Sequence, residues 1–125
     1  MYSPQLLDHF QNPRHAGDLD KADAIAEVEN PVCGDVLRLS LRVTDGKIAE
    51  ARFKAKGCVP AIACASALTE LISGKTLAEA RALNRDDVAC AVGGVPQAST
   101  HAAQLAIDVL SAVLKKIELK AASQL

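Results

Sequence analysis

The sequence predicts an α+β fold: a three-stranded antiparallel sheet covered by helices on one face, followed by a long C-terminal helix. Residues 24–56 alternate apolar and polar side chains with a period of two, which is typical of strands with one buried face. After Pro60 the apolar residues recur at helical spacing instead. Strands that come first and helices that follow favour an α+β fold over an alternating α/β fold. The 125 residues fit one domain, residues 1–125, with room for a core.

A short helix is expected at the N-terminus. Ser3 is a favoured capping residue, and Pro4 suits the first helical turn, where its missing N–H costs nothing. The pair Asn12-Pro13 should end this helix, because the residue before a proline avoids the α region. Its predicted buried stripe consists of the apolar residues Leu6, Leu7 and Phe10.

Three strands are expected next. The first covers residues 24–30, and the second and third flank Asp45-Gly46, a strong signal for a two-residue hairpin turn. Because apolar and polar residues alternate along each strand, the apolar side chains should share one face of the sheet. Helices should cover that face.

Helical spacing begins at Pro60 and continues to Gly74, a plausible C-terminal cap. Thr76 with Glu79 forms a capping-box pattern for a short helix, and Asn84 can cap another. The last helix should run over about residues 99–120. Its predicted buried stripe consists of Ala106, Leu110, Val113, Leu114 and Ile117.

Composition and charge exclude several classes of partner. The formal net charge is −1 and positive and negative residues are mixed along the chain. Nucleic-acid binding needs a clustered positive surface, so no nucleic-acid partner is expected. No apolar run approaches the roughly 18–20 residues of a spanning helix, and no signal peptide is visible. We therefore expect a cytoplasmic protein without membrane contact, whose four cysteines act as ligands, nucleophiles or core residues rather than disulfides.

Two of the cysteines are candidate ligands. Cys33 lies in the tight turn NPVCGD, two residues before Asp35, which can ligate a metal or accept backbone N–H groups. Cys58 follows Gly57 where a strand gives way to a helix, and a helix N-terminus stabilises a thiolate. The alternative readings are an incidental turn residue and a small buried hydrophobe.

The other two cysteines, Cys64 and Cys90, are predicted to be core residues. Cys64 follows Cys58 by six positions, which separates them by about 9 Å along a helix axis, too far to chelate together. Among the histidines, His101 near the start of the last helix is the best ligand candidate, whereas His9 and His15 should lie at the surface. No CxxC spacing typical of a zinc ribbon is present.

Taken together, these segments resemble the IscU/NifU family of iron–sulfur cluster assembly scaffolds, which includes SufU-like proteins. The resemblance covers about residues 2–116 and rests on YSPQLLDHFQNPRHAGDL, NPVCGDVLRLSLRV and IAEARFKAKGCVPAIACASALTELISGKTLAEA. It implies a non-enzymatic scaffold that holds a transient [2Fe–2S] cluster or iron, with Zn²⁺ possible at the same place. It also implies two kinds of partner, a cysteine desulfurase and recipient apo-proteins.

The resemblance assigns a ligand set and shows where this chain departs from the family. Cys33, Asp35 and Cys58 match the first two motifs, and His101 matches the histidine of the third. The family's third cysteine would follow that histidine directly, where this chain has Ala102. The implied set is therefore Cys33, Asp35, Cys58 and His101, which suits tetrahedral Zn²⁺ and would hold a cluster more loosely than three cysteines.

A second departure concerns a chaperone. Members served by a dedicated Hsp70-type chaperone carry Leu-Pro-Pro-Val-Lys before the histidine, whereas this chain has VPQAS at residues 95–99. That partner is therefore not expected. Besides the scaffold, two functions stay open: a zinc-bound sulfur acceptor for a cysteine desulfurase, and a divergent metal-binding paralogue without assembly activity.

Overall fold

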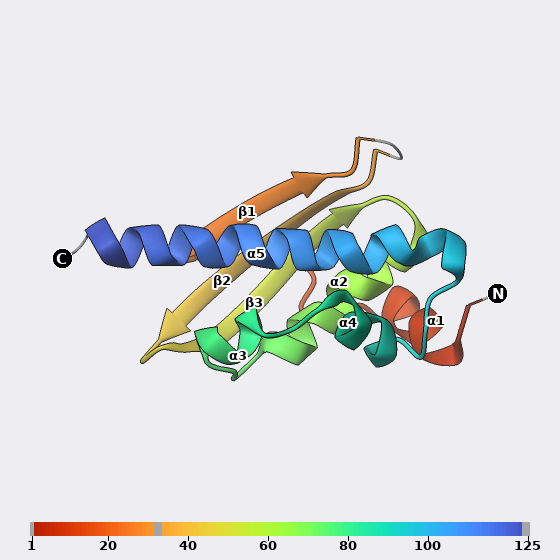
Figure 1. The fold of residues 1–125 in the computed structure, drawn as a ribbon, viewed down its shortest axis with the longest axis horizontal. Helices are drawn as coiled ribbons and strands as arrows, with labels where there is room; N and C mark the ends of the chain where they lie inside the picture. The colour runs from red at the N-terminus through yellow and green to blue at the C-terminus, as the bar shows by residue number, and fades with distance from the viewer. Residues whose placement is uncertain (1, 32–33, 124–125) are drawn as a thin grey trace.

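The computed structural model describes residues 2–31 and 34–123, and it has the expected α+β architecture. Figure 1 shows a long helix lying across a small sheet, with shorter helices beside it. In chain order the elements are α1 (Pro4–Gln11), β1 (Ala24–Glu29), β2 (Val36–Thr44), β3 (Lys47–Lys56), α2 (Val59–Ile72), α3 (Leu77–Arg81), α4 (Arg85–Ala91), the 3-10 turn η1 (Gln97–Ser99) and α5 (Thr100–Ser123).

The sheet has three antiparallel strands in the order β1-β2-β3, as predicted. Its register pairs Ala26 with Leu39 and Leu39 with Phe53, so the apolar residues of all three strands share one face. The hairpin between β2 and β3 turns at Asp45 and Gly46, whose φ values of +54° and +75° fit a two-residue turn with two left-handed residues.

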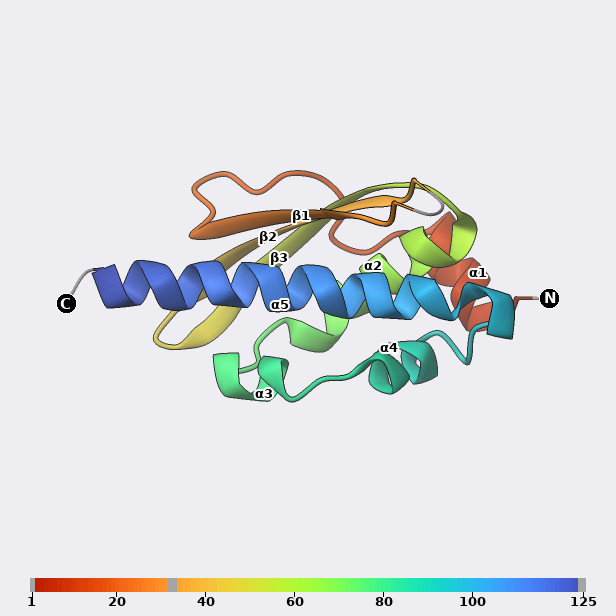
Figure 2. The same cartoon turned by 45° about the horizontal axis from the view of Figure 1, so that its top comes forward.

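The helices cover one face of this sheet. In Figure 2, α5 and the shorter helices lie on one side, while the segment between α1 and β1 passes over the other side. α5 packs against β1 and β2, and α2 packs against β3 and α5. The largest fully buried side chains are Leu6, Leu37, Leu39, Leu41, Ile48, Leu68, Ile72, Leu110, Val88, Val92, Val109 and Val113.

The predicted helix caps are confirmed. The Ser3 hydroxyl accepts the Leu6 N–H, and Thr76 and Asn84 each form a reciprocal capping box with the acidic residue three positions later. The predicted stripe of the last helix is buried throughout. That helix ends at Ser123, slightly beyond the expected boundary. No helix in the described part of the chain is long and apolar enough to cross a membrane.

Three predictions about burial are wrong, those for His9, Leu7 and Cys90. His9 was expected at the surface but is 8% exposed, whereas Leu7 of the expected apolar stripe is 38% exposed. His9 follows Leu6 by three residues and therefore lies on the same helical face, toward α2. Cys90 was expected in the core but is exposed. Val88 on α4 and Val92 at its C-cap are buried, so the position midway between them points outward.

Candidate metal centre

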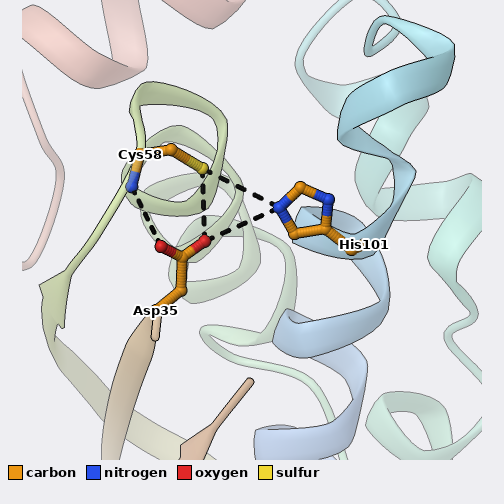
Figure 3. Close-up of side chains that lie close together, drawn as sticks. All are labelled: Asp35, Cys58 and His101. Atoms are coloured by element: carbon orange, nitrogen blue, oxygen red, sulfur yellow. Dashed lines mark hydrogen bonds and ion pairs between the residues drawn. The ribbon is translucent and has the colours of Figure 1, made fainter. Parts of the chain in front are cut away.

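Three side chains from separate parts of the chain meet at one end of the sheet. Figure 3 shows Asp35 from the start of β2, Cys58 from the start of α2 and His101 from the first turn of α5, all pointing toward one another. The Cys58 Sγ atom lies 3.2 Å from Asp35 Oδ2 and 4.0 Å from His101 Nε2. His101 Nε2 lies 3.6 Å from the same Asp35 oxygen.

Asp35 reaches this position because it continues the inner face of β2. Leu37 and Leu39 point toward the helices, and the period of two puts the side chain of Asp35 on the same face. The residue is only 4% exposed. Its backbone carbonyl accepts the Asn30 N–H at 2.8 Å, which holds the entry to β2 in place.

Cys58 occupies the turn from β3 into α2. It is the N-cap residue of α2, with an extended backbone (φ −75°, ψ 165°) and no side-chain capping bond of its own. Its backbone N–H donates to Asp35 Oδ1 at 3.3 Å. Cys58 is half-buried, and the Asp35 carboxylate accepts hydrogen bonds from both its backbone N–H and its thiol.

His101 approaches from the opposite side. The turn η1 ends at Ser99, and Thr100 caps it and begins α5. The Thr100 hydroxyl donates to the Gln97 carbonyl at 3.2 Å, and His101 follows in the first turn of α5. The side chain of His101 is 36% exposed, so solvent reaches the site along its ring. A hollow of about 230 Å³ between the end of β1 and α5 opens beside it.

The three donor atoms are close to the spacing of ligands around a tetrahedral metal. With Zn–S, Zn–N and Zn–O bonds of about 2.3, 2.0 and 2.1 Å, donors around tetrahedral zinc lie about 3.4 to 3.6 Å apart. The observed separations are 3.2, 3.6 and 4.0 Å. A small rotation of one side chain would bring them to the tetrahedral values. A soft sulfur donor, a hard oxygen donor and an intermediate nitrogen donor form a mixed set that suits zinc or ferrous iron.

Protons must leave this site when a metal binds. The Cys58 thiol now donates to Asp35 Oδ2, and the thiolate is the form that ligates metals. His101 must present the lone pair of Nε2, which faces the other two donors. The described residues therefore bring three candidate ligands together, and metal binding would exchange the hydrogen bond between thiol and carboxylate for two metal bonds.

Comparison with known proteins identifies the family. The family model described as NifU-like N terminal domain matches residues 1–124 of this chain. This protein belongs to the NifU-like N-terminal domain family. The iron-sulfur cluster assembly scaffold protein IscU 1 of Archaeoglobus fulgidus is 46% identical over 110 residues, which are 88% of this chain and 72% of that protein. The scaffold protein IscU of Haemophilus influenzae is 39% identical over 123 residues, 95% of this chain and 97% of its own length.

Solved structures of NifU-like proteins share the fold. The N-terminal part of a NifU-like protein from Brucella abortus superposes with a TM-score of 0.77, covers 94% of either chain and is 23% identical. At that identity the likeness concerns the fold alone.

For this NifU-like chain, three of the four predicted ligands lie together: Asp35, Cys58 and His101. The fourth, Cys33, lies outside the described residues, so its place in the ligand set stays a prediction. Cys64 is fully buried, and burial raises the pKa of its thiol to about 12, with the nearby Cys58 adding to the shift. It is a core residue, as predicted.

Sequence reasoning also missed a residue of this site. Gly57 lies against the Asp35 carboxylate, at a backbone φ of +154°. The signal in the sequence was a glycine directly before the candidate ligand Cys58, but only the folded structure shows that it lies against Asp35.

Proposed function

We propose that this protein is an iron–sulfur cluster assembly scaffold, which receives iron and sulfide, carries a transient [2Fe–2S] cluster and passes it to apo-proteins. The observation that carries the proposal is the meeting of Asp35, Cys58 and His101 at one accessible end of the sheet. Relatives named as scaffolds align with 88% to 95% of this chain, which supports the same cargo here.

Each ligand would have a distinct part in holding and releasing that cargo. The thiolates of Cys58 and Cys33 would be the strong iron ligands, and the His101 imidazole would complete the set. Asp35 supplies a hard oxygen donor, which binds iron less tightly than a thiolate and so exchanges more readily. A cysteine desulfurase would supply the sulfur, and apo-proteins would take the finished cluster through the exposed side at His101.

Anaerobic reconstitution tests this proposal. The purified protein is incubated with ferrous iron and sulfide, desalted, and assayed for iron, zinc and acid-labile sulfide. We expect iron and sulfide in similar amounts in the wild type and in Cys90→Ser, because Cys90 is exposed on α4 away from the three ligands. Cys58→Ser should lose both. Zinc without sulfide in the wild type, or full loading of Cys58→Ser, would contradict the proposal.

Asp35→Ala tests the releasing role of the carboxylate. If Asp35 is the exchangeable ligand, its removal should prolong the lifetime of a reconstituted cluster, followed as the decay of visible absorbance under nitrogen. Faster decay in Asp35→Ala than in the wild type would refute that role.

A second function, a zinc-bound sulfur acceptor for a cysteine desulfurase, is favoured by the donor chemistry. A mixed sulfur, oxygen and nitrogen set with near-tetrahedral spacing suits zinc well. A desulfurase assay separates the two functions: strong stimulation by the zinc-loaded protein favours the acceptor. Zinc binding with neither stimulation nor cluster loading would favour a metal-binding paralogue without assembly activity.

A further inference from the structure

We propose that Gly57 is a positioning residue, whose missing side chain leaves the space that holds the Asp35 carboxylate against Cys58 and His101. The inference rests on the proposed metal-binding role of these three residues. In this proposal, Gly57 affects metal affinity only by setting the position of the Asp35 carboxylate.

The strand register places Gly57 directly opposite Asp35. Val36 pairs with Lys56 and Leu37 with Ala55, and this register, extended by one step beyond the last pair of the ladder, places Asp35 opposite Gly57. Opposite residues of an antiparallel pair have their side chains on the same face and only about 5 Å apart. Both positions therefore belong to the inner, helix-covered face.

The Asp35 carboxylate occupies the volume that a side chain at position 57 would need. A Cβ atom added to Gly57 would lie 2.6 Å from Asp35 Cγ and 3.0 Å from Asp35 Cβ, and closer still to Oδ1. The three nearest atoms to that added Cβ all belong to Asp35. The φ of +154° is also a conformation that residues with a Cβ rarely adopt.

Other glycines show that this close approach is not a general property of the turns. Gly34, Gly46 and Gly74 also have positive φ values, between +74° and +81°, but an added Cβ at any of them would meet no atom within 4 Å. Gly46 and Gly74 thus have a positive φ without the contact, and they serve as controls for the loss of a glycine at a positive φ, although φ at Gly57 is larger.

An alanine at position 57 would displace the carboxylate rather than the strand. The backbone of Asp35 is held by the Asn30 N–H, and the neighbouring residues of β2 and β3 are paired. The carboxylate oxygens, in contrast, can move by rotation of one side chain. That rotation would break the contacts to the Cys58 N–H, the Cys58 thiol and the His101 ring together, because one carboxylate makes all three.

The experiment titrates purified apo-protein with Co²⁺, whose visible spectrum reports tetrahedral thiolate coordination, and then displaces it with Zn²⁺. The variants are Gly57→Ala, Asp35→Ala, the double variant and the control Gly46→Ala. Displacing a group that orients metal ligands typically costs about 10- to 100-fold in affinity. We expect that loss in Gly57→Ala and wild-type affinity in Gly46→Ala. In the Asp35→Ala background, adding Gly57→Ala should cause no further loss, because the group it displaces is already absent.

Each outcome decides between the proposals. If Asp35→Ala binds Co²⁺ as the wild type does, the proposed role of Asp35 as a metal ligand is wrong, and the inference about Gly57 is overturned with it. If Asp35→Ala is weakened but Gly57→Ala matches Gly46→Ala, the site stands and the inference about Gly57 is overturned. Should Gly57→Ala fail to fold, folding of the double variant would show that the clash with the carboxylate was the cause. If the double variant also fails to fold, Gly57 is needed only for its backbone conformation, and this result also overturns the inference.

Discussion

Ser66→Ala should destabilise the attachment of α1 and the segment after it to the rest of the molecule. Ser66 is fully buried in the middle of α2. Its hydroxyl oxygen accepts the Arg14 backbone N–H at 2.8 Å and lies 2.8 Å from His9 Nδ1. On the other side of the ring, His9 Nε2 lies 3.4 Å from a Glu70 carboxylate oxygen. Nε2 therefore carries the proton, and Ser66 donates its own proton to Nδ1.

The size of the effect follows from the two groups left without a partner. Leaving a buried donor or acceptor unsatisfied costs about 1 to 3 kcal/mol, and Ser66→Ala strands both the Arg14 N–H and His9 Nδ1. The Arg14 N–H is only part-buried and falls at the low end of that range, so the free energy of unfolding should decrease by about 2 to 4 kcal/mol in total. That is a large share of the total of about 6 to 19 kcal/mol expected for a chain of this length.

Urea unfolding followed by circular dichroism measures this change. Ser73→Ala is the control, because Ser73 is exposed near the end of the same helix and its hydroxyl donates to a single carbonyl, that of Thr69. It should cost no more than about 1 kcal/mol. A Ser66→Ala value within about 0.5 kcal/mol of the wild type would show that the network is not stabilising, since such small changes are typical of surface substitutions.

Three further predictions concern His9, the free cysteines and position 102. Burial lowers the pKa of His9 below its usual 6.5, so the unfolded chain gains a proton first as pH falls. The free energy of unfolding should thus decrease as pH falls below about 6.5, by up to about 1.4 kcal/mol for each unit by which the pKa is lowered. Urea titrations at several pH values measure this dependence on pH, and His9→Gln should remove it. Iodoacetamide should label exposed Cys90 in the native protein and leave buried Cys64 unlabelled until urea is added, as peptide mass spectrometry can check. Ala102→Cys restores the third cysteine of the family, so its reconstituted cluster should last longer than that of the wild type. The control Ala103→Cys, at an equally buried position, should not prolong the lifetime of the cluster. Equal lifetimes for all three proteins would contradict this prediction.

Local chemistry made much of the fold predictable. The hairpin at Asp45-Gly46 and the capping boxes at Thr76 and Asn84 are confirmed, because a turn or a cap depends on a few neighbouring residues. The burial of His9 and the exposure of Cys90 could not be predicted, because burial depends on which face of each helix packs against the rest of the fold. A histidine can be buried when a partner such as Ser66 satisfies its ring.

The sequence by itself determined the order of strands and helices, the turn and cap residues, and the candidate ligands Asp35, Cys58 and His101. It could do so because period, capping and motif are properties of short stretches of chain. Only the tertiary structure decided that these three side chains lie within 3.2 to 4.0 Å of one another, and that Gly57 leaves the space which Asp35 occupies. Distances between residues far apart in the chain depend on strand register and helix packing, which no single stretch of sequence specifies.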